Sequence, residues 1–282
     1  MFTPRLLFLS VLLTLGGPVG AAKVTDVDAV PHLDGRGKEG YRQFLATLPP
    51  RAFAIAPGGA WGYATEAATT EMAEQEALAN CQANTRQRCQ LYARDDRVVL
   101  QQRNWVRAWG PYKSAAEAAR ATVGTQLGAR FPDIVFADAG GKRQKLSDLR
   151  GKAVVLHFWG SWCPPCQREM PDLARLAGNA GQSRDIRFVF LQVRESFATA
   201  RAWANRIGKN LPLYDSGMQQ GNDSQFRLAD GGRLADRAIA MAFPTTYVID
   251  RHGIVVFAHT GPVSGWDQYL PFLRDVAARS GK

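Results

Sequence analysis

The feature that most constrains this chain of 282 residues is a pair of cysteines, Cys163 and Cys166, which follows an apolar segment. That segment, residues 153–158, has the length and the β-branched composition of a buried strand. Pro164 and Pro165 separate the cysteines, and proline fits a helix only in its first turn, where backbone amides lack partners within the helix. The pattern therefore predicts a strand, a turn and a helix that starts at the first cysteine.

A helix start changes the chemistry of a sulfur placed there. The sulfur can accept a backbone hydrogen bond, and the helix dipole favours a negative charge at this end. We therefore expect Cys163 to be the more acidic and nucleophilic thiol, and Cys166 to resolve a mixed disulfide. A structural bridge is a weaker interpretation, because a structural disulfide needs neither the flanking tryptophan nor the two prolines. A zinc site is also weaker, because one Cys-x-x-Cys supplies only two of the four usual zinc ligands.

Further motifs accompany the pair in a fixed order. They are Leu146–Lys152, Trp162–Cys166, Gln167–Pro171 and Phe243–Asp250. Over residues 125–280 the chain resembles the thioredoxin superfamily, and more closely the envelope thiol-disulfide oxidoreductases of the TlpA and ResA type. The resemblance implies an α/β thioredoxin-like fold, with a central mixed sheet flanked by helices. It also implies a protein thiol-disulfide oxidoreductase, for which we expect no cofactor and no metal.

Two residues are candidates for moving protons. Glu169 lies three residues after Cys166, on the same helix face, and the resemblance implies that a glutamate here handles protons. An ordinary surface glutamate is the alternative. His157 stands where thioredoxins have a buried acid, so it is a secondary candidate for proton transfer. A satisfied buried side chain is the favoured interpretation of this histidine.

Three residues are candidates for binding substrate. Pro244 matches the cis-proline of the superfamily, which exposes the backbone of the preceding residue, here Phe243, for strand-like pairing with a substrate. Phe243 is then expected to influence partner choice. Trp162 adjoins the nucleophile at the exposed turn between strand and helix, where simple core packing is the weaker explanation.

The start of the chain has the pattern of an export signal. Residues 1–22 contain one basic residue, Arg5, an apolar run and a small-residue exit. The apolar run is short for a membrane span, although an uncleaved anchor remains an alternative interpretation. We therefore expect a periplasmic protein, in an oxidising compartment where four cysteines can form two bridges.

The length of the chain predicts a second domain. Strand and helix patterns indicate a small α+β domain over residues 23–111, in which Thr70 is expected to cap a helix. A helical linker is expected over residues 112–130, and the thioredoxin-like domain over residues 131–282. In the latter, residues 215–240 look like a loop region with a short helix.

The small domain contains the other two cysteines, Cys81 and Cys89. We expect them to form a structural disulfide, and closing so short a loop adds on the order of 2–3 kcal/mol of stability. A catalytic role is disfavoured because their spacing lacks the helix-start setting that lowers a thiol pKa. The domain resembles small secreted bacterial domains with paired cysteines, and no function or partner follows from that similarity.

The charge gives little information about partners. The formal net charge is +10, but basic residues are dispersed among acidic ones, which favours general solubility over nucleic-acid binding. The expected partners are protein disulfides or dithiols in the envelope and a membrane-bound electron donor. A reductase is the favoured function. The alternatives are a disulfide oxidase or isomerase, an adaptor that uses its N-terminal domain, and, less favoured, a thiol peroxidase.

Overall fold

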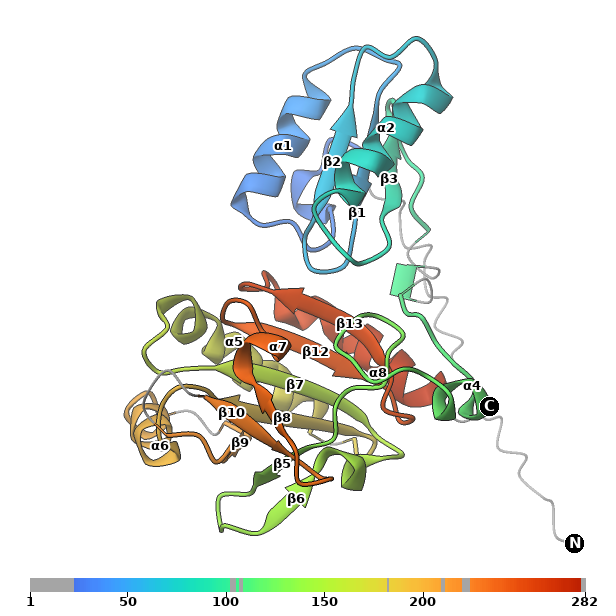
Figure 1. The fold of residues 1–282 in the computed structure, drawn as a ribbon. Coiled ribbons are helices and arrows are strands. Elements are labelled where there is room, and N and C mark those ends of the chain that lie inside the picture. Colours follow the sequence, from blue (N-terminus) through green and yellow to red (C-terminus); the bar gives the residue numbers. More distant parts are fainter. Residues whose placement is uncertain are drawn as a thin grey trace, which may run out of the picture.

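The computed structural model describes residues 23–101, 105–106, 109–181, 183–208, 211–219 and 224–279. The signal sequence expected at residues 1–22 lies outside this part of the chain. Within the described ranges, no helix combines the length and the apolar character needed to cross a membrane. Figure 1 shows two bodies, which we call the first and the second module.

The first module is a four-stranded antiparallel sheet between two helices (Figure 1). The strand order is β2-β1-β3-β4, and the helices are α1 and α2. The bounds are α1 Gly35–Leu45, β1 Ala52–Ile55, β2 Trp61–Ala64, α2 Thr70–Gln82, β3 Gln90–Arg94 and β4 Arg97–Val98.

Large and small side chains alternate along β1, and this alternation explains why the helices cover opposite faces of the sheet. Phe53 and Ile55 belong to the aromatic-rich cluster that includes Tyr41 and Phe44 of α1. Alanines of β1 pack instead with alanines of α2 and with both cysteines of the module. Small side chains allow a close approach, and a Cβ on Gly62 would lie only 2.3 Å from the backbone nitrogen of Cys81.

The second module is built on a five-stranded sheet with the order β13-β12-β7-β8-β9. β7, β8 and β9 run parallel, whereas β12 and β13 are antiparallel to their neighbours. The strands are β7 Ala153–Trp159, β8 Ile186–Gln192, β9 Leu213–Tyr214, β12 Thr245–Ile249 and β13 Val255–Thr260. This mixed central sheet, with α5 directly after β7, is a thioredoxin-like fold.

Both faces of the sheet are covered, so all seven residues of β7 are buried. One face packs against α5, α6 and α8, which are Pro164–Ala180, Phe197–Arg206 and Leu270–Arg279. The other face packs against a small sheet with the order β11-β10-β5-β6. Its strands are β5 Ile134–Ala137, β6 Arg143–Lys145, β10 Gln225–Leu228 and β11 Arg233–Ala235.

Two local expectations need correction. The N-cap of α2 is Thr69 and not Thr70, because Thr69 has the extended backbone of a cap and its side chain accepts from the amide of Met72. Residues 215–240 are not a loop region with a helix alone. They contain the hairpin β10–β11 as well as the short helix α7, Asp236–Ile239, since pairing with β5 provides the hydrogen bonds that make a strand there.

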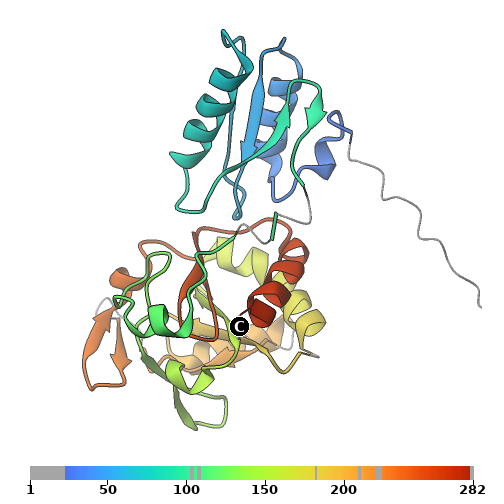
Figure 2. The ribbon, with the colours of Figure 1, turned by 90° about the vertical axis from the view of Figure 1, so that its right-hand side faces the viewer.

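The two modules are in contact. The connecting segment holds the helix α4, Ala115–Ala119, with its capping box between Ser114 and Glu117. Trp109 packs against Phe272 with ring centroids 4.2 Å apart, and the amide of Gly58 donates to the hydroxyl of Tyr269 over 2.9 Å. β13 is the strand nearest to the first module (Figure 1), and the turned view in Figure 2 shows that module over the end of the second module that carries α8.

Candidate active site at the Cys163 and Cys166 pair

The strand β7 and the helix α5 place the cysteine pair at the mouth of a helix. β7 ends at Trp159 and α5 begins at Pro164, so Cys163 is the N-cap residue. Its sulfur accepts a hydrogen bond from the amide of Cys166 over 3.3 Å, and the two cysteines form a disulfide. The helix start predicted from the two prolines is therefore present, and the helix dipole acts on the sulfur of Cys163.

Burial distinguishes the two sulfurs. Cys166 is completely buried, whereas Cys163 keeps 3% of its surface exposed. Only Cys163 is accessible to a partner in this arrangement. The order of reactivity expected from the sequence thus agrees with the order of access.

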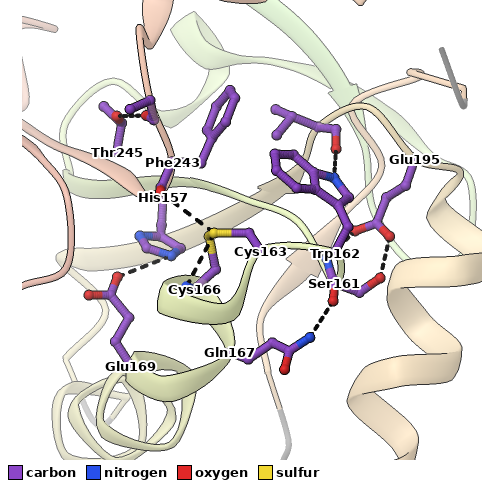
Figure 3. The surroundings of a disulfide bond; sticks show 12 residues. His157, Ser161, Trp162, Cys163, Cys166, Gln167, Glu169, Glu195, Phe243 and Thr245 are labelled. Atoms are coloured by element: carbon purple, nitrogen blue, oxygen red, sulfur yellow. Dashed lines mark hydrogen bonds and ion pairs between the residues drawn. A yellow bond between two sulfur atoms is a disulfide. The ribbon is translucent and has the colours of Figure 1, made fainter. Parts of the chain in front are cut away.

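The loop before β12 faces the pair. The peptide bond between Phe243 and Pro244 is cis, and the carbonyl oxygen of Phe243 lies 3.6 Å from the sulfur of Cys163 (Figure 3). This loop is held at both ends. The hydroxyl of Thr245 donates to the carbonyl of Ala242, and the amide of Gly261 donates to the carbonyl of Pro244.

An exposed aromatic rim borders this loop. Trp162 is 46% exposed, and its indole N–H donates to the carbonyl of Val193 over 2.9 Å. Its ring meets the ring of Phe243 edge-on, with centroids 5.8 Å apart. Met241, 72% exposed, lies two residues before Phe243. Exposed large apolar side chains near a reactive sulfur can contact a partner protein.

A buried glutamate that sequence reasoning missed holds the turn before the cysteines. Glu195 accepts from the amide of Ser161 over 2.6 Å and from the hydroxyl of the same serine. On the other side, Gln167 of α5 donates to the carbonyl of Ser161 (Figure 3). A signal existed in the sequence, because the carboxyl ends of the parallel neighbours β7 and β8 must meet at one edge, and Glu195 follows β8.

Glu169 and His157 meet beneath the pair. Glu169 Oε1 and His157 Nε2 are 3.5 Å apart, and neither atom has a hydrogen-bond partner among the described residues. The other carboxylate oxygen accepts from the amide of Val263 over 2.9 Å, and His157 Nδ1 lies 2.8 Å from Thr246 Oγ1. Figure 3 shows the two side chains pointing toward each other beside the disulfide.

Burial shifts both of these groups toward their uncharged forms. It raises the pKa of Glu169 to about 8 and lowers the pKa of His157 to about 3. A carboxylic acid and a neutral imidazole therefore face each other near neutral pH. Glu169 is no ordinary surface residue, since it is 5% exposed, and only one of the two ring nitrogens of His157 is satisfied.

The remaining features lie apart from this site. A cavity of about 810 Å³ lies along α5 and β8 near Pro171 and Arg184, and no cysteine lines it. In the described ranges, no group of three or more potential metal ligands occurs. The disulfide between Cys81 and Cys89 joins the end of α2 to the start of β3 in the first module.

The fold and this site define a thioredoxin-like protein thiol-disulfide oxidoreductase. Residues 126–269, about half of the chain, match the Redoxin family, and the chain belongs to that family. The match begins after the first module, which therefore lies outside it.

Several known proteins are similar to this half of the chain. The thiol-disulfide oxidoreductase ResA of Bacillus subtilis is 32% identical over 137 residues, which are 49% of this chain and 69% of ResA. ResA of Geobacillus thermodenitrificans is 32% identical over 141 residues, 50% and 73% of the two chains. A solved thiol:disulfide interchange protein from Chlorobium tepidum is 24% identical, covers 52% of this chain and 94% of its own, and has a TM-score of 0.40.

Proposed function

We propose that this protein is a periplasmic reductase of disulfides in other proteins, and that Cys163 and Cys166 are its redox-active pair. The observation that carries the proposal is the setting of Cys163. Its sulfur caps α5, accepts the amide of Cys166, and faces the carbonyl of Phe243 at 3.6 Å. This setting favours a thiolate in the reduced protein and leaves backbone groups beside it for a partner chain.

The reaction is a two-step exchange. The thiolate of reduced Cys163 attacks one sulfur of the substrate disulfide, which forms a mixed disulfide and releases the other substrate sulfur as a thiolate that takes up a proton. Cys166 then loses its proton and attacks the sulfur of Cys163. The second substrate sulfur leaves and is protonated, and the protein is left with the Cys163–Cys166 disulfide that the structure contains. Two electrons have passed to the substrate.

Glu169 is the group that accepts the proton of Cys166 in this scheme. A carboxyl with a pKa of about 8 can both take up and release a proton near neutral pH. His157 acts as a positioning residue, because its Nε2 faces the same carboxyl at 3.5 Å and is uncharged. A hydrogen bond from the protonated carboxyl to this nitrogen would favour the state in which Glu169 has taken up the proton.

Trp162, Phe243 and Pro244 form the substrate-binding rim in this proposal. An extended substrate segment would pair with the backbone of Phe243, while its side chains contact the exposed ring of Trp162. Proline at position 244 provides no backbone N–H, so no donor from that residue competes for the sulfur.

The compartment and the direction are also part of the proposal. The signal pattern of residues 1–22 and the second disulfide support export to an oxidising compartment. A reductase in such a compartment needs a supply of electrons, for which a membrane-bound dithiol donor is suitable. An oxidase or isomerase is the alternative. The reduction potential of the pair, measured against glutathione, separates the two, and a potential near that of strong oxidants would overturn the reductase.

The proposal is tested by trapping. In Cys166→Ala the mixed disulfide cannot be resolved, so substrate proteins should accumulate on Cys163 in cells and be released by a reducing agent. Cys163→Ala is the matched control and should trap none. A Cys166→Ala strain without attached proteins would contradict protein substrates, and wild-type behaviour of a Cys163→Ala strain would favour the adaptor.

A further inference from the structure

A cavity of about 560 Å³ lies between the two modules, beside the loop that faces Cys163. The first module contributes residues 83–86, which follow α2. The second module contributes α7, Met241 and the last residues of β13, Ala258–Thr260. The cavity therefore joins a module of unassigned function to the edge of the proposed substrate-binding rim.

The segment of the first module is held firmly in place. Residues 83–86 belong to the loop that the Cys81–Cys89 disulfide closes. The side chain of Gln82 donates to the carbonyls of Thr85 and Gln87, each over 2.9 Å. Gln87, 1% exposed, donates in turn to the carbonyl of Ala258 in β13 over 3.2 Å. The disulfide loop is thus fixed to the edge strand of the second module.

The wall of the cavity carries unbalanced positive charge. Arg86 and Arg237 line it, and no aspartate or glutamate does. Within the described ranges neither arginine forms an ion pair. The nearby Asp236 is buried and already paired with Arg194 over 2.6 Å. Burial raises the pKa of Tyr247 in the wall, and the positive charge of Arg86 opposes this rise, so the Arg86 guanidinium lies within electrostatic range of the Tyr247 hydroxyl.

The cavity lies within reach of a substrate held at Cys163. Met241 lines it, and Phe243, whose carbonyl is 3.6 Å from the sulfur of Cys163, is two residues away. Extended chain advances about 3.3 Å per residue. We therefore expect a side chain two to four residues from the cysteine of an extended substrate to reach the cavity.

We propose that this cavity binds an acidic side chain of the protein substrate, close in sequence to the cysteine under attack. The first module then takes part in substrate selection by presenting Arg86 on its disulfide-closed loop. This inference rests on the proposed function of the cysteine pair and adds to it the chemical class of the preferred substrate. A carboxylate is the fitting occupant, because the guanidinium groups are the charged donors of the wall.

The experiment compares three disulfides with the full-length protein. One is a peptide disulfide with aspartates three and four residues from the cysteine, the second carries asparagines there, and the third is neutral hydroxyethyl disulfide. We expect wild-type kcat/KM to be about fivefold higher for the acidic peptide than for the amide peptide at low salt. Arg86→Gln should lower this preference, since only Arg237 then remains in the wall, and should leave the rate with hydroxyethyl disulfide unchanged.

Arg88→Gln is the matched control. Arg88 is exposed and lies in the same disulfide loop, but it does not line the cavity. Its replacement should keep the preference for the acidic peptide. Arg86→Glu should abolish the preference for the acidic peptide, because the new carboxylate balances the charge of Arg237. Equal rates of wild type with the acidic and amide peptides, or equal effects of the Arg86 and Arg88 variants, would overturn the proposal.

A binding measurement separates this inference from the redox function. Peptides in which serine replaces cysteine cannot react, so the difference in affinity between the acidic and the amide serine peptide for the oxidised protein reports on the cavity. Weaker binding of the acidic serine peptide to Arg86→Gln supports the cavity even if turnover fails. Absence of turnover with hydroxyethyl disulfide counts against the proposed function only. Equal affinity of wild type and Arg86→Gln for the acidic serine peptide counts against the cavity.

Discussion

The two disulfides lie at opposite ends of their helices: both Cys163 and Cys166 lie at the start of α5, whereas Cys81 lies at the end of α2. In α5, Cys163 is itself the N-cap, where unpaired amides and the positive end of the dipole stabilise a thiolate. In α2 the cap is Thr69, and Cys81 lies in the last turn, where the dipole disfavours negative charge. The same residue type in the same chain is therefore suited to exchange at one helix end and to a permanent bond at the other.

The surroundings strengthen this contrast. Cys163 has a partner-facing side, with the loop of Phe243 and the exposed Trp162 beside it. Cys81 is completely buried among alanines that pack α2 on its sheet. The comparison shows that helix position and access together distinguish a redox pair from a structural one.

The largest expected difference concerns activity. Cys163→Ala should lower turnover of hydroxyethyl disulfide by about a thousandfold or more, since the nucleophile is lost. Replacing Cys81 and Cys89 together by alanine should leave turnover of this small disulfide within about twofold, provided the protein is assayed well below its unfolding temperature. A comparable loss in the double variant would remove the distinction between the pairs.

Glu169 should make the second module sensitive to pH in a way that the first module is not. Its pKa rises on folding from 4.5 to about 8, so the folded state binds more protons between these values and the free energy of unfolding falls as pH rises through them. Glu169→Gln should therefore be more stable than wild type by about 2–4 kcal/mol at pH 9 and no more stable at pH 4. Urea denaturation of the oxidised protein at several pH values checks this. The variant Glu76→Gln, at an exposed position, is the control, and its stability difference from wild type should not change with pH.

The Cys81–Cys89 disulfide should contribute to the stability of the protein, as a structural bridge does. Loss of the Cys81–Cys89 bridge is expected to lower the free energy of unfolding of the oxidised protein by about 2–3 kcal/mol, because an eight-residue closure restricts the unfolded chain. Chemical denaturation of the double alanine variant measures this value. An unchanged midpoint would show that hydrogen bonds such as Gln87 to Ala258 hold the loop without the disulfide.

The proton step should give a smaller effect. Below a pKa of about 8 the carboxylate fraction of Glu169 rises about tenfold per pH unit, so turnover limited by Cys166 should rise from pH 6 to 8. Glu169→Gln should flatten this rise and be about tenfold slower than wild type at pH 8. A variant that keeps the wild-type profile would remove Glu169 from the reaction.

The smallest expected effect concerns the N-cap of α2. Thr69→Ala should destabilise the protein by about 1 kcal/mol, because the side chain of Thr69 accepts from Met72 at the start of α2. Thr70→Ala, one residue later and inside the helix, should change stability by less than about half of that. Thermal unfolding measures the loss of stability in each variant. Equal decreases in unfolding temperature would contradict the assignment of Thr69 as the N-cap.

Local features could be predicted from the sequence because neighbouring residues produce them. The start of α5 follows from two prolines between cysteines, and the capping box of α4 follows from Ser114 and Glu117 three residues apart. The cap of α2 expected from the sequence is one residue too late, since two adjacent threonines offer the same chemistry and only backbone angles distinguish them.

Contacts between distant segments could not be predicted in this way. Ser161 and Glu195 are 34 positions apart, and Glu169 and Val263 are 94 apart. The hairpin β10–β11 within residues 215–240 forms because β5, far earlier in the chain, supplies its hydrogen bonds. No local pattern encodes such partners.

The sequence by itself determined that one sulfur caps a helix and that a second pair of cysteines closes a short loop, because both depend on residues a few positions apart. Only the tertiary structure decided what surrounds them: the buried carboxyl beside an uncharged imidazole, and the arginine of the first module next to the loop of Phe243. The physical reason is that burial and unpaired charge arise when segments far apart in the chain pack together, and they change the pKa and the binding properties of groups that look ordinary in the sequence.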